Sequence, residues 1–526
     1  MRRGRSKIGA WLAFAVGVFL PSYLWLLAMS ASSYSGEVMF ALAVAQIILT
    51  VIALTFLLSP VYGNRQHIGP VVTQFLALHF LIYYGITNVV PALLPELRPQ
   101  EIAAIISVRI PPASPVFYLY ATIAATILAM GLLTGSMLAN KLFLPRKRIA
   151  LVKSRKYAWL PDFNVSLTST LVLLIAILIG TLRFGAGFGT VLTSESTASF
   201  GMLDKLLFNG LLPFLPIAPL LASSAYIQAT TTLQRRKAFR WMIGTVLLVV
   251  VSMLIWRMRT YAMMSIALPV LLLLYVGAIP WCRTVLPAVL LIALAYFGIT
   301  GARINLEKST EWQSGQIDIT EFGNALTTID WQAVTSKTMG DVSYRTAGLE
   351  GVASIIRAQE LGWADTQQGK VLGAGFLQSL PLFLRPEFEI PERVKTAPSF
   401  LGIFLPGDWV TTFLAEFVLD YGIYALIVPG FFVGILIGLV DSGLLSLGIR
   451  PGLQGLLILR FPFLLYPVVF GTTVSDMIVT MFKGTLGFAV IFVVVSLWLS
   501  ARSQLQRRNS HRHKETDVLV TRVLNV

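Results

Sequence analysis

Residues 409–440 read WVTTFLAEFVLDYGIYALIVPGFFVGILIGLV, an apolar run that contains two carboxylates, Glu416 and Asp420. A helix needs about 20 apolar residues to cross the roughly 30 Å hydrocarbon core of a bilayer, so this run is long enough to span a membrane. The run exceeds the length of one crossing, and Pro429-Gly430 lies inside it. We therefore expect a membrane helix that is kinked or split at this pair, because proline interrupts helical hydrogen bonding.

The same apolar pattern recurs along the whole chain. The 526 residues are 56% hydrophobic and 13% charged, and the mean hydropathy is +0.75. No soluble domain of this length hides so much apolar surface, so we predict an all-α polytopic membrane protein of about twelve transmembrane helices. The first helix is expected to be retained and not cleaved as a signal peptide. The predicted spans are 8–29, 38–59, 68–90, 115–138, 164–182, 206–227, 241–256, 260–279, 284–301, 409–440, 453–471 and 485–500.

Lysine and arginine are concentrated in alternate loops, which predicts the orientation because positively charged loops stay in the cytoplasm. Both termini are then cytoplasmic. The net charge of +16 becomes mainly an orientation signal and an attraction to anionic lipid headgroups. Nucleic-acid binding is not expected, since the chain has no soluble basic domain. The main clusters are residues 2–7, 141–156, 235–240 and 502–522.

One long polar stretch, 302–408, interrupts the apolar pattern. It separates an N-terminal bundle of about nine helices (1–301) from C-terminal helices (409–500), which a basic cytoplasmic tail follows (501–526). The orientation places the stretch outside the cytoplasm. It holds nine cationic and thirteen acidic residues, a formal charge of −4. A segment of this length is more than a connection between spans, and we expect it to carry the chemistry of the protein.

Part of this external loop has helical periodicity. Between Arg345 and Leu361, apolar residues recur at Leu349, Val352, Ile355 and Ile356. We expect short helices near the membrane face there. The proline-rich part, from Pro381 to Pro406, is expected to be extended.

The sequence excludes several kinds of catalytic site. Cys282 is the single cysteine, which excludes an intramolecular disulfide and a cysteine-based metal site. None of the four histidines lies in the external loop, so a histidine-activated nucleophile or a histidine-bound metal is not expected there. No glycine-rich phosphate loop follows a predicted strand. We predict a site without metal or cofactor.

Two arginines lie where a span meets the outer membrane surface, and a third lies within a span. Arg257 and Arg259 either snorkel to external headgroups or grip a diphosphate, for which the planar guanidinium fork is suited. Arg460 falls near the middle of its predicted span, where a charge costs ~2.5–3.5 kcal/mol. We expect it to pair with Glu416 or Asp420, which lie one helical turn apart on one face; a catalytic role is the alternative.

The external loop and its edges supply a second set of charged residues. Each of them could be an ordinary solvated side chain. Alternatively, the cations could hold a lipid-linked diphosphate while a carboxylate accepts the proton of an attacking sugar hydroxyl. The candidate cations are Arg303, Arg345, Lys370 and Arg385, and the candidate carboxylates are Asp408 and Glu416.

These residues resemble those of the bacterial oligosaccharide repeat-unit polymerases, the Wzy-type polymerases of O-antigen and exopolysaccharide. One likeness is an arginine before an external-to-internal span, Arg257-Met258-Arg259-Thr260. A second is Arg345 followed by Gly369-Lys370-Val371-Leu372-Gly373 and by Pro381 to Pro386. The third is the span after the loop, with Glu416, Tyr421-Gly422, Gly430 and Gly434. Where many members have Pro-Arg and then Lys-Pro, this chain has Leu384-Arg385-Pro386 and Lys395-Thr396-Ala397-Pro398.

The resemblance implies an architecture similar to the GT-C-like polymerases and ligases, in a bacterial inner membrane. It implies inverting, metal-independent glycosyl transfer at the periplasmic face between undecaprenyl-diphosphate-linked repeat units. It also implies a chain-length regulator of the Wzz kind as a partner. Arg257, Arg259, Arg303 and Arg345 would bind the diphosphate, and Glu416 or Asp408 would act as base or organiser.

Two other functions remain open. An O-antigen ligase has a similar topology, but ligases are similar to one another in using an external histidine, which the loop of this chain lacks. A transporter or flippase of lipid-linked glycans is the alternative that is not an enzyme. Transporters tend to have internal repeats and broken helices around a site at mid-membrane. No repeat is visible here, although Arg460 and Glu416 would suit a transporter.

Overall fold

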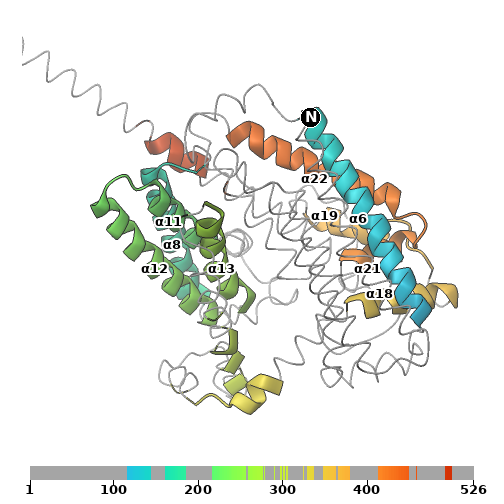
Figure 1. Ribbon diagram of the computed structural model, residues 1–526. Helices are drawn as coiled ribbons and strands as arrows, with labels where there is room; N and C mark the ends of the chain where they lie inside the picture. Colours follow the sequence, from blue (N-terminus) through green and yellow to red (C-terminus); the bar gives the residue numbers. More distant parts are fainter. Residues whose placement is uncertain are drawn as a thin grey trace, which may run out of the picture.

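The computed structural model describes the ranges 115–143, 160–184, 216–255, 259–276, 348–362, 365–379, 413–448 and 492–499, and short pieces at 278, 290, 296–298, 300–301, 304–305, 324, 328–336, 458 and 501. The regular structure in these residues is helical, which confirms the all-α prediction for this part of the chain (Figure 1). The predicted spans 8–29, 38–59 and 68–90 lie outside it.

Among the described residues, three helices are long and apolar enough to cross a bilayer. They are α6 (Pro115–Phe143), α8 (Phe163–Phe184) and α22 (Ile427–Gly448). A shorter apolar helix, Tyr261–Leu273, lies within α13. Large apolar side chains stand exposed on the long helices, for example Leu178 on α8 and Phe432 on α22, as expected for faces that contact lipid. The chain is a multi-pass membrane protein.

Helices α6 and α22 pack closely and run in the same direction (Figure 1). Gly131 of α6 lies beside Ile427, at the start of α22. Nearer the other end, the Ser442 hydroxyl of α22 donates a hydrogen bond to Asn140 Oδ1 of α6 at 2.9 Å. The predicted topology requires this parallel arrangement, because both helices belong to spans that pass from outside to inside.

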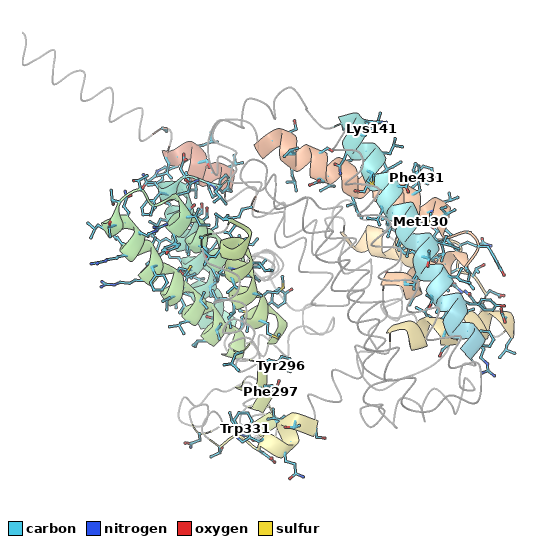
Figure 2. All side chains as sticks on the ribbon, in the orientation of Figure 1. Met130, Lys141, Tyr296, Phe297, Trp331 and Phe431 are labelled. Atoms are coloured by element: carbon cyan, nitrogen blue, oxygen red, sulfur yellow. The ribbon has the colours of Figure 1, made fainter. Side chains whose placement is uncertain are left out.

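Glycines make the close approach of these two helices possible. A Cβ added at Gly131 would lie 2.7 Å from the Ile427 carbonyl oxygen, and one added at Gly438 would lie 2.7 Å from the Ser136 carbonyl oxygen. At Gly434 the added Cβ would meet the backbone of Leu132. Small residues spaced four apart let the backbones of membrane helices touch, which strengthens dispersion and weak hydrogen bonds. Figure 2 labels Met130 and Phe431 along this pair.

A second group of helices comprises α8, α11 (Ile217–Gln228), α12 (Thr232–Ile255) and α13 (Arg259–Val276). The start of α8 lies against the end of α11: the Ser166 hydroxyl is 3.4 Å from that of Ser224, and the Gln228 side-chain amide donates to the Leu160 carbonyl. Helices α8 and α11 therefore run in opposite directions, as the predicted topology requires.

Helix α12 begins at Thr232, nine residues before the predicted span 241–256. A capping box starts it: Gln234 N–H donates to Thr231 Oγ1 at 3.2 Å, and Thr231 N–H donates back to Gln234 Oε1 at 3.3 Å. The first turns of α12 carry four exposed cations, so hydropathy alone does not assign these turns to the span. These cations are Arg235, Arg236, Lys237 and Arg240.

The predicted break in the span 409–440 exists, but its predicted position is wrong. Helix α21 (Phe413–Tyr421) ends at Gly422, whose φ of +67° is a conformation that glycine adopts readily. A turn follows, and α22 begins at Ile427. Pro429 lies in the first turn of α22, where the backbone N–H needs no partner within the helix, so it is compatible with the helix and does not break it.

Candidate functional site

The candidate site lies where the polar loop 302–408, which is predicted to be external, packs on α21, the helix that precedes α22. Two loop helices are described there, α18 (Gly348–Glu360) and α19 (Lys370–Ser379). Helix α18 packs on α6 and α21, and α19 packs on α21. The Arg357 guanidinium lies 5.6 Å from the centre of the Phe117 ring, near the start of α6. Helix α18 thus sits at the end of α6 opposite Lys141, which is the end predicted to face outward (Figures 1 and 2), whereas α19 lies farther along, at the end of α21.

The helical periodicity predicted between Arg345 and Leu361 is confirmed by α18. Val352, Ile355 and Ile356 are buried, with exposed fractions of 0–2%. The side chain of Leu349 is outside the described residues. The buried face holds α18 against α6 and α21, which places the external loop directly over the acidic helix.

Helix α21 is buried along its length, from Leu414 to Asp420. Glu416 and Asp420 lie one turn apart on one face, as predicted, with exposed fractions of 2% and 1%. Buried carboxylates are costly unless hydrogen bonds or opposite charges compensate for the lost hydration. Both residues have interactions in the structure.

Asp420 receives its hydrogen bonds from the external loop. The backbone N–H of Val371 donates to one carboxylate oxygen at 3.0 Å, and that of Leu372 donates to the other at 2.9 Å. These are the second and third residues of α19, so Asp420 fills the position of an N-cap from a distant part of the sequence. The sequence analysis predicts that Arg460, which is outside the described residues, pairs with Glu416 or Asp420, and it does not anticipate this cap.

Helix α21 lies outside the three candidate spans, and burial shifts the pKa values of two of its side chains. Desolvation raises the pKa of the Asp420 carboxyl, and hydrogen bonds from the backbone of Leu372, Val371 and Gly369 act in the opposite direction. Burial and the neighbouring charge of Asp420 raise the pKa of the Tyr421 hydroxyl. The ionised form of Asp420 matches the cap, because it can accept both N–H groups at once.

Of the predicted site residues, the structure brings Glu416 and Lys370 to the same region. Lys370 is the first residue of α19, and its side chain is exposed. Arg259 is the first residue of α13, in the other group of helices, and its side chain is not described. The remaining predicted residues lie outside the described part of the chain: Arg257, Arg303, Arg345, Arg385 and Asp408.

Four of the five glycines in the likeness to the polymerases have structural explanations here; an added Cβ at the fifth, Gly373, would meet nothing within 4 Å. Gly430 and Gly434 are required by the contact of α22 with α6, and Gly422 ends α21. Gly369 has a φ of +85° and lies against the Tyr421 hydroxyl, 2.9 Å from where a Cβ would be. Packing and backbone conformation explain these four glycines, so they need no role in substrate binding.

No protein-family model, curated protein or solved structure matches this chain. Within the described residues, no cluster of three or more His, Cys, Asp or Glu could hold a metal ion. The residues that bear on function are therefore those of the loop, of α21 and the predicted arginines.

Proposed function

We propose that this protein polymerises undecaprenyl-diphosphate-linked oligosaccharide repeat units into a surface or secreted polysaccharide, at the periplasmic face of a bacterial inner membrane. The observation that supports this most is the position of the external loop. Its helices α18 and α19 pack on the buried acidic helix α21, Lys370 is exposed at the start of α19, and α18 lies at the end of α6 that is predicted to face outward. A lipid-linked substrate would present its diphosphate at this level of the membrane.

The reaction that suits these residues is an inverting glycosyl transfer. A sugar hydroxyl of the acceptor attacks the anomeric carbon of the donor, the bond from that carbon to the diphosphate oxygen breaks, and the hydroxyl proton passes to a carboxylate. Negative charge grows on the leaving diphosphate. Preplaced cations stabilise that charge more in the transition state than in the ground state, which lowers the barrier. The cations assigned to this role are Arg257, Arg259, Arg303, Arg345, Lys370 and Arg385.

The carboxylate roles divide by burial. A general base must come within hydrogen-bonding reach of the hydroxyl that it deprotonates. Glu416 is 2% exposed, which favours the role of organiser over that of base. Asp408 is then assigned as the base.

An in-frame deletion of the gene tests the proposal and separates it from its alternatives. We expect the deletion strain to produce glycan capped with a single repeat unit, visible as the loss of the polymer ladder on a gel. Accumulation of unligated lipid-linked polymer would instead indicate an O-antigen ligase. Accumulation of lipid-linked units in the cytoplasmic leaflet would indicate a flippase. Either of these two results would exclude polymerisation as the function of this protein.

The location of α19 tests the geometric premise separately. Gly373 is exposed, and an added Cβ there would meet nothing within 4 Å, so Gly373→Cys is a suitable labelling position in a Cys282→Ser background. We expect a membrane-impermeant maleimide to label this cysteine in intact spheroplasts. A matched cysteine at exposed Arg236, predicted to be cytoplasmic, should react only after the membrane is opened. The reverse pattern would place the external loop in the cytoplasm and end the proposal.

A further inference from the structure

The end of α21 and the start of α19 cap each other. Carbonyl groups in the last turn of α21 accept hydrogen bonds from the external loop: Gln367 N–H donates to Leu419 at 3.0 Å, and Gln368 N–H donates to Asp420 at 2.8 Å. In return, the Asp420 carboxylate accepts the N–H groups of Val371 and Leu372. The partially negative end of one helix thus meets the partially positive start of the other.

A strained turn leads into this contact. Gln368 has a φ of +51°, which is uncommon for a residue with a side chain, and Gly369 follows with a φ of +85°. Such conformations persist where surrounding interactions hold them. Here the holding interactions are the bonds of Gln367 and Gln368 to α21. Separately, the Gln359 side-chain amide of α18 donates to the Val418 carbonyl at 3.1 Å and holds α18 on α21.

The backbone amides at the start of α19 all have acceptors. Lys370 N–H donates to the Gln367 carbonyl at 3.1 Å, and Gly373 N–H donates to the Gly369 carbonyl at 2.8 Å; the two amides between them bond to Asp420. The helix start therefore has no spare donors for an anion. The group that α19 offers to a diphosphate is the side chain of Lys370.

We infer that Asp420 is a positioning residue: by fixing the start of α19 on α21, it sets where the Lys370 ammonium stands at the lipid diphosphate. This inference rests on the proposed function. Asp420 itself is buried and reaches no substrate; it acts through Lys370. The Asp420 carboxylate fixes α19 on α21, the helix that precedes α22. The position of α19 relative to the membrane helices is thereby fixed.

The first test measures the geometry without any glycan. Spin labels are placed at Gly373→Cys on α19 and at Tyr424→Cys, which is 91% exposed in the turn after α21, with Cys282→Ser as background. We expect one narrow distance distribution in the parent and a broad one in Asp420→Asn. The Asn variant keeps the side-chain volume but replaces one acceptor oxygen by an NH₂ donor that faces a backbone N–H. Exposed Asp365, five residues before Lys370, gives the matched control Asp365→Asn, which should leave the distribution narrow.

The second test asks whether Asp420 acts through Lys370. With purified protein in vesicles and a lipid-diphosphate-linked repeat unit, we expect Asp420→Asn and Lys370→Ala each to lower kcat/KM by about tenfold. The kcat/KM of the double variant should be no lower than that of the less active single variant, because without the Lys370 ammonium the cap no longer affects the reaction. Asp420→Glu, which keeps the carboxylate, should recover part of the activity. Multiplying effects in the double variant would overturn the inference.

The two tests separate failure of the inference from failure of the proposed function. An unchanged distance distribution in Asp420→Asn overturns the positioning role whatever the protein catalyses. If the parent protein has no polymerase activity, the proposed function is wrong, and so is the proposed role of Lys370 at a diphosphate. Gly369→Ala perturbs the same contact from the loop side, because its Cβ would meet the Tyr421 hydroxyl at a positive φ. It should broaden the distribution as Asp420→Asn does, and a narrow distribution there would count against the cap as the determinant of the position of α19.

Discussion

Gly434→Leu is expected to abolish recovery of folded protein from the membrane. A Cβ at this position would overlap the backbone of Leu132 in α6, and backbone atoms cannot move aside as a flexible side chain can. Ordinary overpacking costs roughly 1–3 kcal/mol, and separating two helices in contact along their length costs more. We expect a several-fold loss of the monodisperse peak in size-exclusion chromatography after detergent extraction.

The same helix supplies the matched control. An added Cβ at Gly443 meets nothing within 4 Å, so Gly443→Leu makes the same change of side chain in α22 without the collision. It should be recovered like the parent. Gly135→Leu, on the opposite helix, should reproduce the loss, because its Cβ would meet the backbone of Phe431. Normal recovery of both Gly434→Leu and Gly135→Leu would show that α6 and α22 are not packed as described.

Arg345→Ala and Arg259→Ala are expected to abolish polymer while the protein still inserts into the membrane. Loss of one preorganised donor to a developing negative charge lowers kcat by about 10²–10³-fold. Either substitution should therefore reduce the ladder to single repeat units when it replaces the chromosomal copy. Arg345→Lys keeps the charge but loses the bidentate fork, so we expect an intermediate chain length.

Arg236, in the first turns of α12, provides the matched control for these arginines. Arg236 is exposed in the basic first turns of α12, on the side predicted to be cytoplasmic, and Arg236→Ala should leave the ladder intact. Membrane fractions of all variants should contain equal amounts of protein. Normal chain length in both Arg345→Ala and Arg259→Ala would remove the assigned diphosphate site.

The sequence alone predicted part of the membrane architecture. The spans 115–138 and 164–182 correspond to α6 and α8, and the helical spacing between Arg345 and Leu361 corresponds to α18. These predictions succeed because the length of an apolar run and the period of a helix are local properties. The start of α12 was missed for the same reason: its first turns are helical through local capping, yet they are too charged to register as part of a span.

The break between α21 and α22 shows where local rules compete. Proline is the stronger helix breaker in the sequence, so the pair Pro429-Gly430 was preferred. The chain instead turns at Gly422, and Pro429 falls in the first turn of the next helix, where its missing N–H costs nothing. Gly430 is then used for contact with Leu128 of α6, which no sequence pattern within one helix reveals.

What the sequence determined by itself was a membrane protein with several apolar helices and one long polar stretch rich in cations and carboxylates, because these follow from hydropathy and charge along one chain. The orientation that the charges indicate stays a prediction. Only the tertiary structure decided what Asp420 does. Asp365 and Thr366 lie closer to the start of α19 and are good local caps by residue type. The cap comes instead from a carboxylate some fifty residues away, because the buried amides of α19 and the buried Asp420 each need a partner and packing brings them together.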